Sequence, residues 1–316
     1  MKKIYKFIII IIICLFGAKI SNNSREEIVE PETAYLISTP DDLLNFANSV
    51  NSGNTYNGKY IKQICDIDLK DIDWPTIGLY DLDYSFEGIY DGGGHVIKNL
   101  SAKVGGNNAL FGKLGGTVMN LGIENGEVIG ACVGAITSHA SNSSAIIINC
   151  YNKASVSGAR AGGIADNFIG SIINCWTDCD LKSESIDNIG GIVSYDANSV
   201  INCYSFRDGG TTSKKNGEII DLQNNTVNLQ KIVDKLNKEL FYSAKISGVD
   251  YHNLYFWEVS KDGKTIVFTN EKASIKNKYL IQYIITWLDM NFSYIFIGVG
   301  VCMFVYVFSK SKEKEI

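Results

Sequence analysis

The sequence predicts an all-β fold, a right-handed parallel β-helix, because two short motifs recur in it with one common period. The first motif is Ile-Asn-Cys followed by an aromatic residue, at 148–151, 173–176 and 201–204. Its cysteines are separated by 25 and then 28 residues. The second motif is Gly-Gly-Ile, which recurs after 28 residues at 162–164 and 190–192, with a degenerate copy at 134–136. A fixed period of this length is typical of repeat architectures.

The residues before each repeated cysteine are apolar and β-branched, and they run for only a few positions before Asn, Gly or Ser. This pattern indicates short strands between turns. Such a unit cannot bury its own apolar face, but it can stack on a neighbour with strands about 4.8 Å apart. The asparagines that mark the phase predict about four coils; they are Asn120, Asn149, Asn174 and Asn202.

Strand alternation predicts which side chains face the core. In the first motif it places Ile148 and Cys150 inside and Asn149 and Tyr151 outside, and the other two motifs follow suit. We favour this facing because free cysteine behaves as a small buried hydrophobe. The alternative buries the three asparagines as an amide ladder, which is costly unless every amide is paired.

The composition is that of a globular protein and argues against nucleic acid as a partner. The 316 residues carry a net charge of −5 with a pI near 5.3, whereas binding to phosphates requires a basic surface. Thirty glycines and three prolines suit a solenoid with many turns.

The N-terminal residues predict export. Residues 1–20 have basic Lys2, Lys3 and Lys6 followed by the apolar run 7–16, as in a signal peptide. Ten residues are too few to span a bilayer unaided, although an uncleaved signal anchor remains the alternative. Residues 21–34 are polar and acidic and are expected to form a spacer.

We expect residues 35–100 to form an N-terminal cap with leader strands, and residues 101–205 to form the β-helix repeats. Thr39, Pro40 and the acidic pair after them are typical of a helix start. An apolar face then follows at Leu43, Phe46, Ala47 and Val50, as expected of a helix that covers the open end of a solenoid.

The order of these features resembles the leader of GLUG-repeat cell-surface proteins. The segments that carry the resemblance are 36–47, 66–69, 74–78, 86–88 and 91–100, and the Gly-Gly-Ile and Ile-Asn-Cys-Tyr motifs resemble the repeats of that family. The similarity covers roughly residues 35–270, although the repeat glycines are eroded at 134–135 and the coils are few. It implies a β-helix at the cell surface and no activity, because the motif residues are structural. Related repeats precede the catalytic part of IgA1-protease-like peptidases.

Residues 206–270 are expected to form a C-terminal cap. An amphipathic helix is predicted over 227–241, and a hairpin around the turn at Asp262-Gly263 follows it. These pieces are similar to the tail that ends GLUG arrays.

The last part of the chain predicts a membrane anchor. After a juxtamembrane segment, 271–287, the apolar stretch 288–308 is long enough to span a bilayer as one helix. The lysines of the tail, 309–316, predict that it is cytoplasmic. We therefore expect a single-pass protein of the cell membrane with residues 21–279 outside. The alternative for 288–308 is a buried core helix.

No residue pattern in the sequence predicts catalysis, a cofactor or a metal. The three histidines share no metal-ligand spacing. Acids are dense between 66 and 91, where they could bind Ca²⁺ or cleave a glycosidic bond; they are Asp66, Asp68, Asp71, Asp73, Asp81, Asp83, Glu87 and Asp91. The interpretation we favour is that these acids support turns through their own side chains.

Six cysteines lie between the two apolar segments, so disulfides are an alternative for an exported chain. We expect Cys150, Cys175 and Cys203 to be free thiols. Equivalent side chains of stacked rungs are about 4.8 Å apart, whereas the Cβ atoms of a disulfide are about 3.8 Å apart.

Two functions of different class remain. The first is adhesion or surface scaffolding without catalysis, with an extracellular protein or glycan as ligand. The second is a carbohydrate-active enzyme (a lyase or glycoside hydrolase) or an accessory subunit of a surface peptidase, by analogy of fold. The outward positions favour binding, because they offer amides and aromatic rings instead of acid–base pairs; they are Asn149, Tyr151, Asn174, Trp176, Asn202 and Tyr204.

Overall fold

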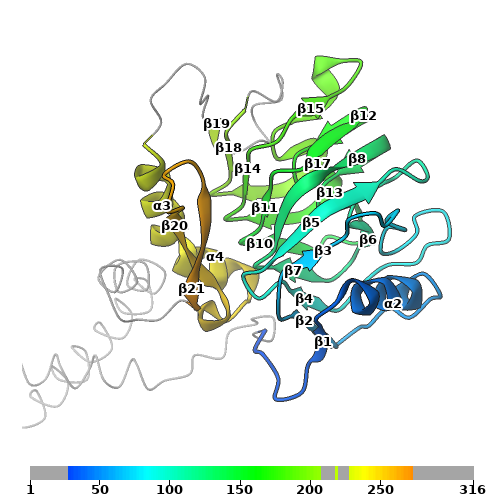
Figure 1. Cartoon of the computed structure of the whole chain (residues 1–316), viewed down its shortest axis with the longest axis horizontal. Coiled ribbons are helices and arrows are strands. Elements are labelled where there is room, and N and C mark those ends of the chain that lie inside the picture. The colour runs from blue at the N-terminus through cyan, green and yellow to red at the C-terminus, as the bar shows by residue number, and fades with distance from the viewer. Residues whose placement is uncertain (1–27, 208–217, 220–227, 273–316) are drawn as a thin grey trace, which may run out of the picture.

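The computed structural model describes residues 28–207, 218–219 and 228–272, which form a parallel β-solenoid of about six turns with few helices (Figure 1). Its first face consists of parallel strands in the order β1 (Tyr35–Ile37), β2 (Tyr60–Gln63), β4 (Ile89–Asp91), β7 (Thr117–Met119), β10 (Ile146–Ile148), β13 (Ala165–Ile173) and β17 (Val193–Ile201). The register keeps repeat positions together, since Ile147 pairs with both Val118 and Ile172.

The second face contains β3 (Ile67–Asp68), β5 (Val96–Ala102), β8 (Gly122–Gly134), β11 (Tyr151–Asn152), β14 (Trp176–Thr177), β18 (Tyr204–Ser205) and β19 (Glu218–Ile219). Beside β8 it is extended by β12 (Ser155–Gly162), β15 (Leu181–Lys182) and β16 (Ile189–Gly190), with the short helix η1 (Ile186–Asn188) between the last two. The third face is formed by β6 (Phe111–Leu114), β9 (Thr137–Ala140) and the first parts of β13 and β17.

The number of turns is larger than the four that the asparagines predicted. Residues 35–100 form solenoid turns of their own, with β1, β2 and β4 stacked below β7. The register places Gly92 at the position that Asn120 occupies in the next turn, and the same position one turn earlier is Gln63. Counting asparagines therefore omitted the first turns, because the marker residue is absent from them.

Helix α2 (Pro40–Val50) forms part of the first turn and covers the end of the core, as its apolar face predicted. Thr39 and Asp42 form a capping box, and Leu43, Phe46, Ala47 and Val50 are buried. The ring of Phe46 packs edge to face on the rings of Tyr56 and Phe86, with ring centroids 5.0 Å and 5.3 Å apart.

The inward cysteine column is confirmed, but the facing of the neighbouring isoleucines was wrong. Cys150, Cys175 and Cys203 are buried in the main core. Ile148, by contrast, packs outside the solenoid in a second apolar cluster. The reason is Asn149, whose φ of 56° is left-handed. Strand alternation does not continue through such a corner, so Ile148 and Cys150 point to different sides.

A C-terminal unit lies along the flank of the solenoid, beside β7, β10 and β14 (Figure 1). It consists of α3 (Leu229–Lys238), α4 (Leu240–Ser247), the short helix η2 (Tyr251–Asn253) and the antiparallel hairpin β20 (Tyr255–Val259) and β21 (Ile266–Lys272). Leu240 and Ala244 of α4 pack on Ile148 and Ile173. The unit thus covers the outward side of the repeated motif.

Among the described residues, no helix is long and apolar enough to cross a membrane. The predicted signal peptide, 1–20, and the predicted membrane helix, 288–308, both lie outside the described residues.

The cysteine column allows a direct test of packing. All six cysteines in the described part of the chain are free, and the amide of Cys150 donates to Sγ of Cys175 at 3.4 Å. We expect Cys175→Ala to lower the free energy of unfolding by about 1 kcal/mol, because it leaves a small cavity. Cys175→Val should cost less, since it refills the volume and breaks no disulfide. Urea unfolding measures both, and a disulfide-linked peptide from this column would contradict the assignment.

Candidate functional site

The aromatic residues that were predicted to form an open binding face are covered. Tyr151 and Trp176 are stacked with centroids 4.6 Å apart, and Tyr204 continues their column one strand further. All three are buried, beneath Trp257 and Phe268 of the C-terminal hairpin. The rings do point away from the solenoid core, as predicted, but they form the contact between two parts of one chain.

Strand alternation offered a buried amide ladder as the alternative to the inward cysteine column. The structure contains both the ladder and the column. The Nδ2 atoms of Asn149 and Asn174 each donate to Oδ1 of the preceding asparagine at 2.9 Å, and Asn202 bonds to Asn174 in the same way. Asn120 and Asn149 also donate to the carbonyl oxygens of Asn253 and Tyr255, at 2.8 and 3.0 Å. The left-handed corner allows both columns, because it turns the asparagine outward toward the C-terminal unit.

A buried carboxylate, Asp91, begins this ladder. It accepts hydrogen bonds from Asn120 Nδ2 at 2.8 Å, the Gly93 amide at 3.0 Å and the Tyr60 hydroxyl at 2.9 Å. Its side chain is fully buried, and this burial raises the pKa of Asp91 above its usual value despite the three donors.

The two ends of the ladder favour opposite amide orientations. Asp91 presents an oxygen atom to the Asn120 side chain, so the Nδ2 group of Asn120 turns toward it as the donor. At Asn174, the reversed orientation would bond Leu236 O and Trp257 Nε1, each at 3.1 Å. We assign the orientation that Asp91 imposes, because it keeps one unbroken chain of hydrogen bonds from Asp91 through Asn120 and Asn149 to Asn174.

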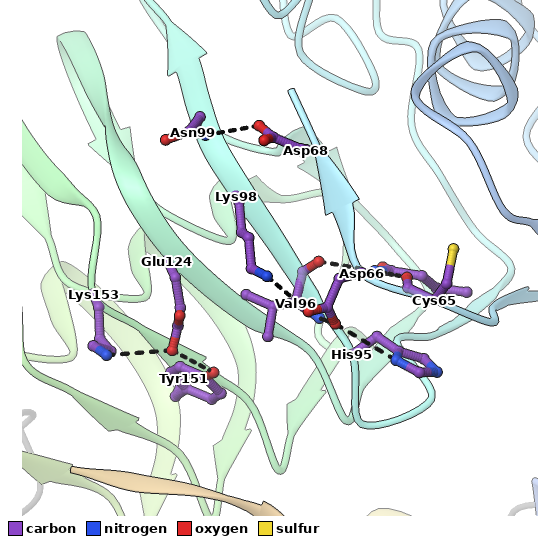
Figure 2. A network of polar contacts seen from close by, with 11 residues as sticks. Cys65, Asp66, Asp68, His95, Val96, Lys98, Asn99, Glu124, Tyr151 and Lys153 are labelled. Carbon is purple, nitrogen blue, oxygen red and sulfur yellow. Dashed lines mark hydrogen bonds and ion pairs between the residues drawn. The ribbon is translucent and has the colours of Figure 1, made fainter. Parts of the chain in front are cut away.

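Most of the acids between 66 and 91 lie in turns or in local ion pairs. Figure 2 shows Asp66, which accepts from the Val96 amide at 3.1 Å and from Lys98 Nζ at 2.9 Å, and Asp68, which accepts from Asn99 at 2.7 Å. Burial acts to raise the pKa of Asp66. The hydrogen bonds from Lys98 and from the Val96 amide outweigh burial, so the pKa of Asp66 is lowered.

The remaining acids of this stretch are dispersed. Asp71 and Asp83 have left-handed backbones, with φ of 64° and 58°. Asp83 forms an ion pair with Lys113, and Glu87 bonds to Ser85 at 3.2 Å. Within the described ranges, no group of three or more His, Cys, Asp or Glu side chains could hold a metal ion.

A strip of opposite charges crosses the second face of the solenoid. Lys98 pairs in register with Glu124, and Glu124 accepts from the Tyr151 hydroxyl at 3.0 Å and from Lys153 Nζ at 3.2 Å (Figure 2). Asp66, Lys98, Glu124 and Lys153 are named here the charged strip. Their side chains are 24–45% exposed, so the strip is paired internally and remains accessible to a partner.

A second polar cluster was missed by the sequence reasoning. Ser138 Oγ is 2.8 Å from His139 Nδ1, and His139 Nε2 is 4.0 Å from Asp166 Oδ2. Arg160 donates to both oxygens of Asp166, at 3.0 and 2.8 Å, and to Cys132 Sγ at 3.1 Å. The 28-residue period could have revealed it, since it separates Ser138 from Asp166 and Cys132 from Arg160.

This cluster contains the residue types of a catalytic triad, but its geometry is that of a structural brace. Ser138 is buried and donates its proton to the Cys132 carbonyl at 2.7 Å. Asp166 is neutralised by Arg160 and also accepts from Ser194 at 2.6 Å. Burial lowers the pKa of His139 and so favours its neutral form. A nucleophile needs a free path to its substrate and a base oriented by the carboxylate.

Comparisons with known proteins identify one distant structural relative. No family model matches the sequence, and no curated protein matches it. The crystal structure of a Bacteroides ovatus protein, provisionally described as an immunoglobulin A1 protease, is similar with a TM-score of 0.47 and 19% sequence identity. The similarity covers 76% of this chain and 93% of that one. It is too distant to transfer a function to this chain.

The amide ladder predicts a graded response at Asn149. Asn149→Ala should lower the free energy of unfolding by about 2–4 kcal/mol, because it combines left-handed strain with unpaired buried polar groups. Asn149→Gly also removes the amide, but glycine adopts the left-handed backbone without strain. It should therefore cost about 1–2 kcal/mol less than Asn149→Ala. Urea denaturation measures the difference. Equal costs would show that the corner conformation contributes nothing.

Asp91 predicts a pH-dependent stability. Because its pKa is raised in the folded state, its contribution is present below the usual aspartate pKa of about 4 and is lost as pH rises through the raised value. The stability of the natural chain relative to Asp91→Asn should therefore fall from pH 4 upward. Asp68→Asn is the control: the Asn99 bond lowers the pKa of Asp68, so its contribution is present above about pH 4 and is lost only as pH falls below that value. Thermal unfolding at several pH values measures both slopes; parallel curves would contradict the assignment.

Proposed function

We propose that this chain is a cell-surface β-solenoid, anchored in the membrane and serving in adhesion or as a scaffold without catalysis. In this proposal it belongs to the GLUG-repeat proteins, its coil is right-handed, residues 1–20 are a signal peptide and 288–308 are the membrane helix. The observation that carries it is the way in which the two ends of the described chain are held together.

Residues 28–30 are bound to the C-terminal unit. Ile28 bridges to Val249, with its amide donating to Gly248 O at 2.8 Å. Glu30 forms ion pairs with Lys272 at the end of β21 and with Lys62 of β2. We call these contacts the clasp. They bring both described ends to one side of the domain, from which a single membrane attachment can extend without strain on the fold.

The surface supports binding more than catalysis. The charged strip is partly exposed, with Lys98 and Glu124 on the paired strands β5 and β8 and with Asp66 and Lys153 next to the ends of β3 and β11, a form suited to a polar extracellular ligand. The Ser138–His139–Asp166 set is the strongest support for the alternative, a carbohydrate-active enzyme or an accessory subunit of a surface peptidase. Its buried hydroxyl and its Arg160-bound carboxylate make that alternative the weaker one.

Topology provides the first test. Protease added to intact cells should digest residues 21–279 and spare a C-terminal epitope tag placed after Ile316, because the tail lysines predict a cytoplasmic end. Permeabilised cells are the control, in which the tag is lost as well. Survival of the solenoid on intact cells would contradict the surface location.

Ligand binding provides the second test. The purified domain should bind on an array of glycans and extracellular-matrix proteins, and Lys98→Glu with Lys153→Glu should weaken that binding at least tenfold. Reversing both charges disrupts the strip without touching the core. A control with Lys103→Glu alters a charge off the strip. Hydrolysis or cleavage of any array component would favour the enzyme alternative.

A further inference from the structure

Four exposed apolar side chains gather around the first strand of the solenoid. Val29, Tyr35, Leu36 and Ile64 are 57%, 46%, 53% and 44% exposed. Tyr35 and Leu36 belong to β1, the end strand of its sheet, and the Ile64 amide donates to Ile37 O at 3.0 Å, which places Ile64 beside the end of that strand. We call these four residues the foot patch.

The other large exposed apolar side chains in the described part of the chain are more scattered. Leu82, Val104 and Ile186, for example, lie in the turn 80–83, in the bend 104–107 and in the short helix η1. Single exposed apolar side chains are normal on protein surfaces, whereas several together mark a surface that contacts something.

The foot patch adjoins the clasp. Val29 lies between the two clasp residues Ile28 and Glu30, and Leu36 pairs in register with Lys62, to which Glu30 is bound. The apolar surface and both ends of the described chain therefore lie together.

The length of chain between the clasp and the proposed membrane helix is short. Leu288 is 16 residues after Lys272. This length reaches at most roughly 55 Å when fully extended. A tether of this length raises the effective concentration of the patch at the bilayer, so weak contacts suffice to hold it there.

We propose that the foot patch rests on the outer surface of the lipid bilayer and orients the solenoid. The proposal rests on the membrane attachment proposed above. Leu36, Ile64 and Val29 enter the interfacial layer. Tyr35 projects from the other side of β1 and suits the headgroup level, where its ring and its hydroxyl are both satisfied. The last turns, at β15 and η1, then point away from the membrane, since β1 and β15 lie at opposite ends of the solenoid (Figure 1).

The test uses the full chain reconstituted into liposomes of phosphatidylcholine and phosphatidylglycerol. The photoreactive residue p-benzoyl-phenylalanine replaces Leu36 in one protein and Ile186 in a matched control, whose native side chain is 59% exposed at the far end. Intact-mass spectrometry counts lipid adducts after irradiation. We expect at least a tenfold higher yield at position 36. Adding Ile64→Asp to the first protein should lower its yield several-fold while its flotation with the liposomes is unchanged.

Each outcome of this experiment is decisive. Flotation with equal adduct yields at 36 and 186 overturns the orientation and leaves the membrane attachment standing. Adducts between two copies of the chain at position 36 overturn the lipid assignment in favour of self-association. Failure of the unmodified chain to float overturns the membrane attachment and the orientation with it.

Discussion

The left-handed asparagine corner is the constraint on which the rest of this structure depends. A left-handed backbone costs most residues about 1–2 kcal/mol, and asparagine tolerates it better than most. At Asn120, Asn149, Asn174 and Asn202 it turns the chain sharply between the first and second faces. Because each amide then bonds to the one below, a costly conformation becomes a continuous column that aligns successive turns.

The C-terminal unit that covers this column must also pair its remaining donors, because a donor buried without a partner is costly. The C-terminal unit provides carbonyl acceptors from Asn253 and Tyr255, and its hairpin buries the aromatic rings of the repeated motif. The side of the solenoid that looked most suited to a ligand is thus internal. The charged strip and the foot patch, where we propose that partners bind, remain accessible.

Two buried carboxylates in the described part of the chain, Asp91 and Asp166, are paired with neighbouring polar groups. Asp91 accepts hydrogen bonds from three donors, and Asp166 accepts hydrogen bonds from Arg160 and Ser194. Both are buried carboxylates of a kind that often marks an active site. Here each also joins neighbouring turns of the solenoid, which accounts for them structurally: Asp91 binds Tyr60 and Asn120, and Asp166 binds Ser194.

The sequence by itself determined the parallel solenoid, the inward cysteines and the helix at the first turn. These follow from the common period of two motifs and from the cap at Thr39, which are local properties. Only the tertiary structure decided the number of turns, the side on which Ile148 packs and the burial of Trp176. The asparagine marker is missing at Gly92, alternation fails across a left-handed residue, and the cover comes from α4 and a hairpin nearly 100 residues away. Contacts over such distances leave no periodic trace in the chain, so no pattern of residues could reveal them.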